Sequence, residues 1–260
     1  MKLVSNEGVP KGRLQGLMEG RLTDGNGNVL YQTLLKYNGK NELSAFRENW
    51  NGKKYVTKYT YDHNGLRVKK VVNGVTTEYM LHGKLVTGVK SGSDVLKIAY
   101  DEQSRPAMVE YNGVWYGYVK DLQGDIVGIV DSNGTEVVKY SYDVWGFPMF
   151  ATEGSMASTL GKANPFRYRG YVYDEETGLY YAQERYYNPE WCRFISADDS
   201  DAVKAMQTEQ TDKNLYAYCD NNPIIREDKE GGILEFCSGS SGRSGDRSNE
   251  ADPIECGIWQ

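Results

Sequence analysis

The sequence predicts an all-β protein built from stacked hairpins, and three observations lead to this fold class. The chain of 260 residues contains 21 Tyr and 29 Gly but only 7 Pro, a composition typical of a turn-rich β protein. A short turn signal recurs along most of the chain, with Asp or Asn behind an aromatic or apolar residue and often a Gly soon after. Towards the C-terminal end, large planar residues alternate with polar ones at a period of two, which indicates strands.

The recurring turn signal predicts an array of hairpins. In each unit the Asp side chain accepts hydrogen bonds from backbone amides two residues on, the Gly supplies a left-handed turn position, and the Tyr ring packs on the sheet. Such hairpins cannot bury their faces alone, so we expect them to stack into one elongated sheet. About eight signals lie roughly 10 to 25 residues apart. They are Thr23 to Gly27, Tyr37 to Gly39, Tyr61 to Gly65, Tyr100 to Ser104, Lys120 to Gly124, Val130 to Gly134, Tyr142 to Gly146 and Tyr173 to Gly178.

A segment dense in Tyr, Arg and Gly follows this array at residues 164–199. Alternation of its rings with polar residues predicts strands that are half buried on one face. The run Asp174 to Gly178 and the pair Asn188–Pro189 are turn signals, so we expect at least two hairpins here. The alternating rings are Phe166, Tyr168, Tyr171 and Tyr173.

Four arginines of this segment are open to two interpretations, an anion site or packing. We favour stacking on rings and pairing with the acids Asp174, Glu175 and Glu184 inside a dense β fold. The arginines are Arg167, Arg169, Arg185 and Arg193.

The same segment resembles the core that closes the repeat array of Rhs/YD-repeat proteins. The resemblance rests on RYRGYVYDEETGLYYAQERYYNPEWCRFISADD followed by NLYAYCDNNPIIREDKEG, and it covers roughly residues 20–231, most strongly at the end. These proteins include polymorphic toxins of bacteria, C components of insecticidal toxin complexes and wall-associated relatives in Gram-positive bacteria. The resemblance implies a sheet that winds into a hollow β-shell, with the Rhs repeat-associated core plugging one end. About eight units are too few to close a large shell alone.

Four regions are expected along the chain. They are an N-terminal segment (1–20), a YD-repeat hairpin array (21–150), an Rhs core (151–231) and a variable, flexible tail (232–260). The Ser- and Gly-rich run at 238–245 has nothing to bury, which predicts a disordered short tail. This tail is too short to be a toxin enzyme domain.

The charge and hydropathy patterns exclude two kinds of partner. Thirty Lys and Arg are spread among thirty-six acids, for a net charge of -6, so we expect no nucleic acid to bind. The sequence holds no apolar run of membrane-span length and residues 1–20 hold no signal peptide.

We expect a secreted or cell-surface location as part of a full-length Rhs protein. The expected partners are the remainder of a longer array or an encapsulated C-terminal peptide, with glycans as a further candidate.

We expect no metal and no cofactor. Asp24 begins a calcium-loop pattern, but Val29 and Leu35 stand where that loop needs Gly and Glu, and the two His have no ligand partners at suitable spacing. Four cysteines fit no zinc motif and are interpreted as buried or incidental thiols, with a Cys237–Cys256 disulfide as the alternative. They are Cys192, Cys219, Cys237 and Cys256.

Two carboxylates, Asp198 and Asp228, are the candidate catalytic residues. Each follows a strand-like run, so from the residues alone we interpret both as turn or cap residues. Brought together, they would share one proton and act as base and acid on a peptide bond. The resemblance implies that the matching aspartates carry out an intramolecular aspartyl-type cleavage between about residues 231 and 236. However, Asp199 and Lys229 stand where the family has prolines, which counts against cleavage. Because the cleavage would be intramolecular and no other catalytic motif is found, any enzyme activity is at most a single-turnover autoproteolysis.

The favoured function is a structural carrier, namely a segment of the encapsulating β-shell of an Rhs-type secreted toxin or wall-associated protein that lacks a recognisable toxin domain. Self-cleavage that releases the tail is one alternative. A surface adhesion module that stacks glycans on exposed rings is the other, although most rings are expected to be core. The rings considered include Trp50, Trp115, Trp145 and Trp191.

Overall fold

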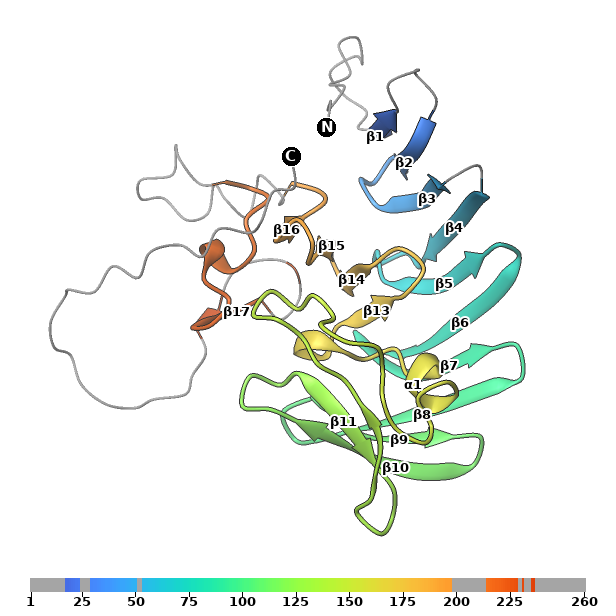
Figure 1. Ribbon diagram of the computed structural model, residues 1–260, viewed down its shortest axis with the longest axis vertical. Coiled ribbons are helices and arrows are strands. Elements are labelled where there is room, and N and C mark those ends of the chain that lie inside the picture. The colour runs from blue at the N-terminus through green and yellow to red at the C-terminus, as the bar shows by residue number, and fades with distance from the viewer. Residues whose placement is uncertain are drawn as a thin grey trace, which may run out of the picture.

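The computed structural model describes residues 17–23, 29–50, 53–197, 214–228, 231 and 235–236. These residues form a twelve-stranded sheet, a four-stranded sheet and a two-stranded ribbon (Figure 1). The large sheet comprises β1 (Leu17–Thr23), β2 (Val29–Tyr37), β3 (Leu43–Trp50), β4 (Lys53–Tyr61), β5 (Arg67–Val72), β6 (Val75–His82), β7 (Leu85–Ser91), β8 (Asp94–Tyr100), β9 (Pro106–Tyr111), β10 (Val114–Lys120), β11 (Ile126–Val130) and β12 (Glu136–Lys139). The small sheet comprises β13 (Val172–Asp174), β14 (Leu179–Ala182), β15 (Arg185–Asn188) and β16 (Arg193–Phe194). The ribbon pairs β17 (Arg226–Glu227) with β18 (Glu235–Phe236), and the helical turns are α1 (Leu160–Ala163), η1 (Tyr168–Gly170) and η2 (Cys219–Asn221).

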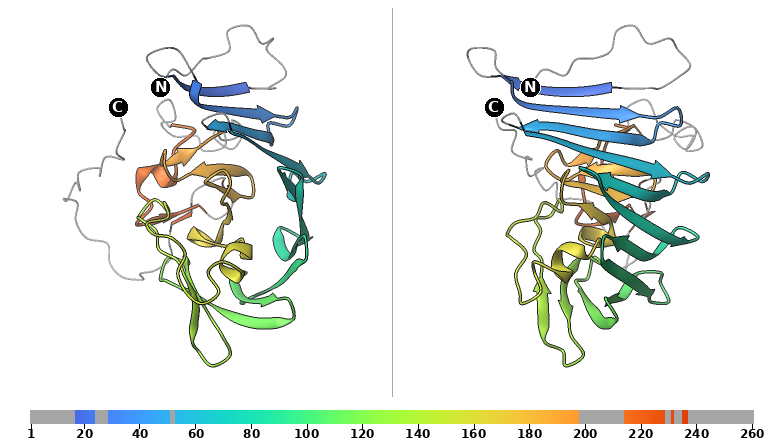
Figure 2. Two further views of the ribbon diagram at one scale, coloured as in Figure 1. Left: turned by 45° about the vertical axis from the view of Figure 1, so that its right-hand side comes forward. Right: turned by 90° about the vertical axis from the view of Figure 1, so that its right-hand side faces the viewer.

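The large sheet confirms the predicted array of stacked hairpins. Its strands follow one another in sequence order from β1 to β12, and each pair is antiparallel. Strand β8 shows why these residues form strands, since Leu96 and Ile98 are buried while Lys97 between them is exposed. The sheet curls around the small sheet, which lies against its concave face (Figure 2). The fold is therefore all-β. The curled sheet β1 to β12 is called the array below, and the small sheet β13 to β16 with the segments packed around it is called the core domain.

The predicted turns join successive strands at Asn38, Asp62, Asp101, Asp121 and Asp131. The two-residue turns at 73–74, 83–84, 92–93 and 112–113 were not predicted. The predicted turn after Thr23 lies outside the described residues. Asp62 Oδ1 accepts the backbone N–H of Asn64 and that of Leu66, each at 2.9 Å, and Gly65 has a φ of 83°. A left-handed φ of this kind favours Gly because a side chain would be strained there. The fourth residue of the turn thus closes the hairpin, and the register of β4 with β5 shifts between Thr60 and Tyr61, next to this turn.

The Tyr of the repeat unit has a role beyond ring packing. Its hydroxyl donates to a backbone carbonyl of the preceding part of the array, from Tyr61 to Leu43 at 2.7 Å, from Tyr100 to Val86 at 2.8 Å and from Tyr142 to Ile126 at 2.8 Å. Each of these three Tyr therefore ties its own turn to the hairpin before it, because a buried hydroxyl needs a partner.

A buried ion network joins the array to the core domain. Arg67 of β5 is 2% exposed, and its Nη1 lies 2.6 Å from Oδ2 of Asp174, which is fully buried at the end of β13. Lys70 Nζ lies 2.9 Å from Oδ1 of Asp174 and 2.9 Å from Oε1 of Glu176. Burial opposes ionisation of Asp174, but the two cations more than offset it and hold the pKa of this carboxyl below its usual range. The two positive charges of the array, on Arg67 and Lys70, thus face the two acids of the core domain, Asp174 and Glu176.

The predicted hairpins of the core domain form, with two corrections. The turns after Asp174 and after Asn188 are confirmed. The first predicted strand is wrong, since Phe166 makes one isolated bridge and Tyr168 lies in η1, where Arg169 takes a left-handed φ of 55°. Half burial is also wrong for β14 and β15, in which every residue is buried. These strands are covered on both faces because the array packs on one side and an aromatic cluster on the other.

This aromatic cluster explains the density of Tyr. Three of its hydroxyls find partners on one turn of the array: Tyr168 donates to Val144 O, Tyr180 to Gly146 O and Tyr187 to Trp145 O, all within 2.9 Å. Burial without such partners would cost free energy. The rings of the cluster are Tyr168, Tyr171, Tyr180, Tyr187, Phe194 and Tyr218.

The two described cysteines differ in their chemical state. Cys192 is disulfide-bonded, so the prediction of an incidental thiol is wrong for this residue, whereas Cys219 is a buried thiol. Cys237 and Cys256 lie outside the described residues.

Within the part of the chain that the structure describes, no helix is both long enough and apolar enough to cross a lipid bilayer.

Candidate functional site

Asp228 follows directly after β17 and is 1% exposed. Its Oδ1 accepts the backbone N–H of Gly231 at 2.7 Å, so the residue does hold a turn, as the residues alone predicted. Its Oδ2 lies 3.5 Å from Nη2 of Arg185. A buried carboxylate that faces a guanidinium has the chemistry of a functional site as well as of a turn.

Arg185, at the start of β15, connects Asp228 to three other parts of the core. Its Nε donates to Gly231 O, and its Nη1 donates to Leu215 O at 3.1 Å. Its guanidinium carbon lies 3.6 Å from the centroid of the Phe194 ring. The predicted stacking of this arginine on a ring is confirmed, but the predicted acid partner is wrong, because Arg185 pairs with Asp228.

The other three arginines also have defined surroundings. Arg167 stacks at 4.0 Å on the Tyr140 ring and lies 3.7 Å from Glu175. Arg169 Nε lies 3.7 Å from Asp125, an acid that the sequence did not suggest. Arg193 is exposed in β16. Stacking on a ring is confirmed for Arg167 and for Arg169, whose guanidinium carbon lies 5.2 Å from the Tyr168 ring centroid, but pairing with a predicted acid is confirmed for Arg167 alone.

Tyrosines cover the Asp228 backbone. The Tyr171 hydroxyl donates to the carbonyl oxygen of Asp228 and lies 3.5 Å from the Tyr218 hydroxyl. Burial, and secondly the charge of Asp228, raise the pKa of Tyr171 well above its usual value. Tyr171 therefore stays a neutral donor across the physiological pH range.

An extended segment pairs beside Asp228. Glu235–Phe236, within the expected tail, form β18 against β17, with Glu235 opposite Glu227, the residue before Asp228. A cavity of about 330 Å³ lies between the concave face of the array and the core domain, and its wall includes Tyr171 and Glu227. The site therefore combines a buried carboxylate with an extended strand next to it, and the residue before Asp228 borders the cavity.

The second candidate residue, Asp198, lies outside the described residues, as do Asp199 and Lys229. The described chain approaches Asp198 through β16, which pairs with β15, the strand of Arg185. It resumes beside β16, where Arg193 bridges Ala217 and Phe194 N–H donates to Tyr216 O at 3.0 Å. Both aspartates are therefore preceded by a segment that meets β15: β16, before Asp198, pairs with it, and Asp228 at the end of β17 faces its Arg185.

The rings considered for glycan binding are mostly used in packing. Trp145 packs against the aromatic cluster and Trp191 against the main hydrophobic core, whereas Trp115 on β10 is 42% exposed. The side chain of Trp50 lies outside the described part of the chain. Two of the three described tryptophans are thus half-buried and used in packing, and Trp115 is exposed.

Stacked hairpins that curl around a Tyr-rich core form a structural β-shell. The chain belongs to the Rhs/YD-repeat family, because residues 24–224 match the family model described as Teneurin YD-shell.

Two curated relatives come from Bacillus. The chain is 36% identical over 214 residues to the tRNA3(Ser)-specific nuclease WapA of Bacillus spizizenii and 37% identical over 214 residues to the tRNA nuclease WapA of Bacillus subtilis strain 168. Each match covers 80% of this chain but 9% of the relative. A shorter match, 39% identical over 72 residues, covers 28% of this chain and 5% of the toxin protein Tse5 of Pseudomonas aeruginosa. The chain therefore spans less than a tenth of the length of these relatives.

Solved structures share the fold. The crystal structure of TcdB2-TccC3-Cdc42 matches with a TM-score of 0.58 at 20% identity, over 76% of this chain and 10% of that chain. The crystal structure of TcdB2-TccC3 without the hypervariable C-terminal region matches with a TM-score of 0.57 at 17% identity, over 83% of this chain and 13% of that chain. At these identities the likeness concerns the fold.

Proposed function

We propose that this chain is a structural carrier, the closing segment of a YD-repeat shell. Residues 21–150 are the last part of the array, residues 151–231 are the core domain that closes it, and residues 232–260 are the variable segment that the shell carries. The partners are the remainder of a longer array, which adds strands beyond β1, and the carried C-terminal peptide. The protein acts at the cell surface or after secretion, as part of a longer polypeptide.

The contact between array and core domain is the observation that carries this proposal. Tyr37 of β2 donates its hydroxyl to Ile195 O at 3.0 Å, across 158 residues of sequence. The hydroxyls of Tyr61 and Tyr186 lie 3.0 Å apart, and the Arg67 pair with Asp174 adds a buried charge contact. Several hairpins along the curled sheet thus hold the same core domain, as a closed end requires.

A cut between the two parts tests this architecture in the intact chain. A specific protease site is placed at the exposed Phe150, which is 70% accessible, and the cut protein is passed over a sizing column. We expect both pieces to elute together, because the interface is buried and hydrogen-bonded. The same cut in an Asp174→Asn chain should separate the pieces more readily. Separation of the unsubstituted pieces in native buffer would contradict the proposal.

Self-cleavage is the second candidate function, and the surroundings of Asp228 favour it. The carboxylate is buried, faces Arg185 at 3.5 Å, and lies next to the β17–β18 ribbon. We propose that Asp198 joins it and that the scissile bond lies just before Glu235, within the range 231–236. Because a guanidinium favours the charged carboxylate, Asp228 suits the role of base.

The proposed reaction balances without a cofactor. Asp228 takes a proton from a water molecule as the water oxygen bonds to the scissile carbonyl carbon. Asp198 gives its proton to the leaving nitrogen as the C–N bond breaks. The products are a new carboxyl terminus on the shell and a new amino terminus on the released peptide, and the two aspartates end with one shared proton.

Intact mass after incubation at neutral and mildly acidic pH tests this reaction. We expect the wild-type chain to lose a peptide that begins near Glu235, and Asp198→Asn and Asp228→Asn to stay whole. Asp220→Asn is the matched control, since Asp220 is an exposed acid on the same segment that pairs with Arg226, and it should cut like wild type. A wild-type chain that stays whole at both pH values would rule out self-cleavage.

A further inference from the structure

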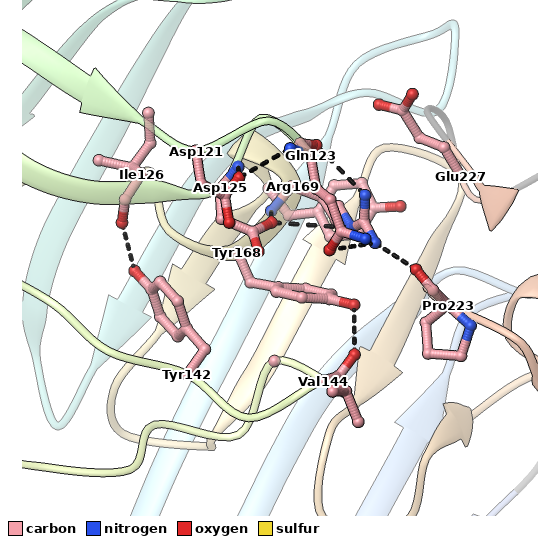
Figure 3. Close-up of polar contacts among 12 residues, drawn as sticks. Asp121, Gln123, Asp125, Ile126, Tyr142, Val144, Tyr168, Arg169, Pro223 and Glu227 are labelled. Atoms are coloured by element: carbon pink, nitrogen blue, oxygen red, sulfur yellow. Dashed lines mark hydrogen bonds and ion pairs between the residues drawn. The ribbon is translucent and has the colours of Figure 1, made fainter. Parts of the chain in front are cut away.

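One turn of the array reaches into the segment that carries Asp228. The turn between β10 and β11 is built like the others, because Asp121 Oδ1 accepts the N–H of Gln123 and that of Asp125, each at 2.9 Å. The residues after Asp121 differ in their contacts, since they face the core domain (Figure 3). Asp125 is 6% exposed, and its Oδ1 accepts the backbone N–H of Arg169 at 2.8 Å.

Arg169 is held in one position by this turn. Its backbone is left-handed, with a φ of 55°, a conformation that costs free energy in a residue with a side chain and persists where its surroundings impose it. Its Nη1 donates to Gln123 O at 3.2 Å and its Nη2 to Gln123 Oε1 at 3.0 Å. The guanidinium carbon lies 5.2 Å from the centroid of the Tyr168 ring.

The same two side chains bind the backbone that leads to Asp228. Arg169 Nη2 also donates to Pro223 O, and Gln123 Nε2 donates to Ile224 O at 2.8 Å. Two successive carbonyls are therefore held by donors from two different parts of the molecule. A neighbouring repeat turn adds a weak third contact, in which Arg105 Nη2 lies 3.9 Å from Oε2 of Glu227.

We propose that Gln123 and Arg169 form a clamp that fixes Pro223 and Ile224 and thereby positions Asp228 for self-cleavage. The inference rests on the self-cleavage proposed above and assigns positioning residues to it. A guanidinium suits this role because its planar fork makes several directed hydrogen bonds at once, which an ammonium group does not reproduce. The clamp also links the array to the reaction, since Gln123 belongs to a repeat turn and Asp228 to the core domain. A shell folded around its core domain would thus be a condition for cutting.

The variants Gln123→Ala, Arg169→Ala and Arg169→Lys test the clamp in the full chain. Gln103→Ala is the matched control, because Gln103 holds the same place in the turn that begins at Asp101 and is exposed. Hydrogen–deuterium exchange of peptides covering residues 214–228 reports on the clamp directly. We expect exchange there to be about tenfold faster in the three variants than in wild type or the control, while peptides from β5 to β9 are unchanged.

The cleavage rate, followed by intact mass, gives the second readout. Since a displacement of about 1 Å can cost on the order of 100-fold in rate, we expect the three variants to cut 10- to 100-fold more slowly than the control. Guanidinium ion at a non-denaturing concentration should restore part of the rate to Arg169→Ala but not to Gln123→Ala, because only the former leaves a guanidinium-shaped space. General destabilisation would not be relieved in this way.

The two proposals fail in different ways. Unchanged exchange at residues 214–228, or variants that cut at the wild-type rate, would overturn the clamp and leave self-cleavage standing. A wild-type chain that never cuts would remove the reaction and with it the positioning role.

Discussion

The buried ion network between the array and the core domain gives the sharpest stability prediction. Asp174→Asn removes the carboxylate that lies 2.6 Å from Arg67 and 2.9 Å from Lys70. Both cations are at most 9% exposed, so water cannot replace the lost charge. Breaking a buried pair by removing one partner costs about 3–5 kcal/mol, because it leaves an uncompensated charge inside the protein. For a chain of this size, that loss lowers Tm by roughly 6–20 °C.

Denaturant unfolding, followed by tryptophan fluorescence, and a thermal scan measure this loss. Glu175→Gln is the matched control one residue further on, since the Glu175 side chain is 47% exposed and lies 3.7 Å from Arg167. We expect the control to lose less than about 1 kcal/mol. A loss in Asp174→Asn no larger than that of the control would refute the reasoning.

The pH dependence of the same variant follows from the lowered pKa of Asp174. A carboxyl group whose folded pKa lies below its unfolded value, near 3.9, stabilises the fold above that value. This contribution is lost as the pH falls from about 4 through the folded pKa. Asp174→Asn should therefore remove part of the acid sensitivity of the wild-type chain, which unfolding curves between about pH 2 and 6 would show.

Three further outcomes are expected. Burial raises the pKa of Asp125 to about 6, above its unfolded value near 3.9. The contribution of this group to stability should therefore fall by on the order of 2–3 kcal/mol as the pH rises from 4 to 6, and in denaturant unfolding Asp125→Asn should be more stable relative to wild type at pH 6 than at pH 4. Gly231→Ala should destabilise the core and slow the loss of the C-terminal peptide, because the new Cβ would lie 2.7 Å from a backbone carbonyl oxygen at a φ of 73°. Gly178→Ala is the control: its φ of 67° is similar, but the new Cβ meets no atom within 4 Å, so the change should cost only about 1 kcal/mol. Lys97→Ala removes a surface pair with Glu110 at 2.8 Å, in which Lys97 is 61% exposed, so its midpoint in denaturant should stay within about 1 kcal/mol of wild type.

The site shows where prediction from sequence ends. Asp228 was identified by its match to the family motif, but its partner Arg185 was assigned to other acids, because a sequence does not state which of several nearby charges will meet. The two lie 43 positions apart in the sequence, and they meet only because β15 and the end of β17 pack in the same core. Gln123 and Arg169 carried no signal of a shared role, since the contacts that unite them with Pro223 cross the array and the core domain.

The local features of this protein follow from its amino-acid sequence: the succession of hairpins, the Asp-centred turns and the all-β class. Each depends on hydrogen bonds and alternation within a few residues, so a short stretch of sequence is enough to predict it. Three other features arise from long-range packing: β14 and β15 are buried on both faces, Arg67 meets Asp174 across 107 residues, and Arg169 is left-handed. These features depend on how the curled sheet and the core domain pack together, and packing is a property of the whole chain rather than of any short stretch.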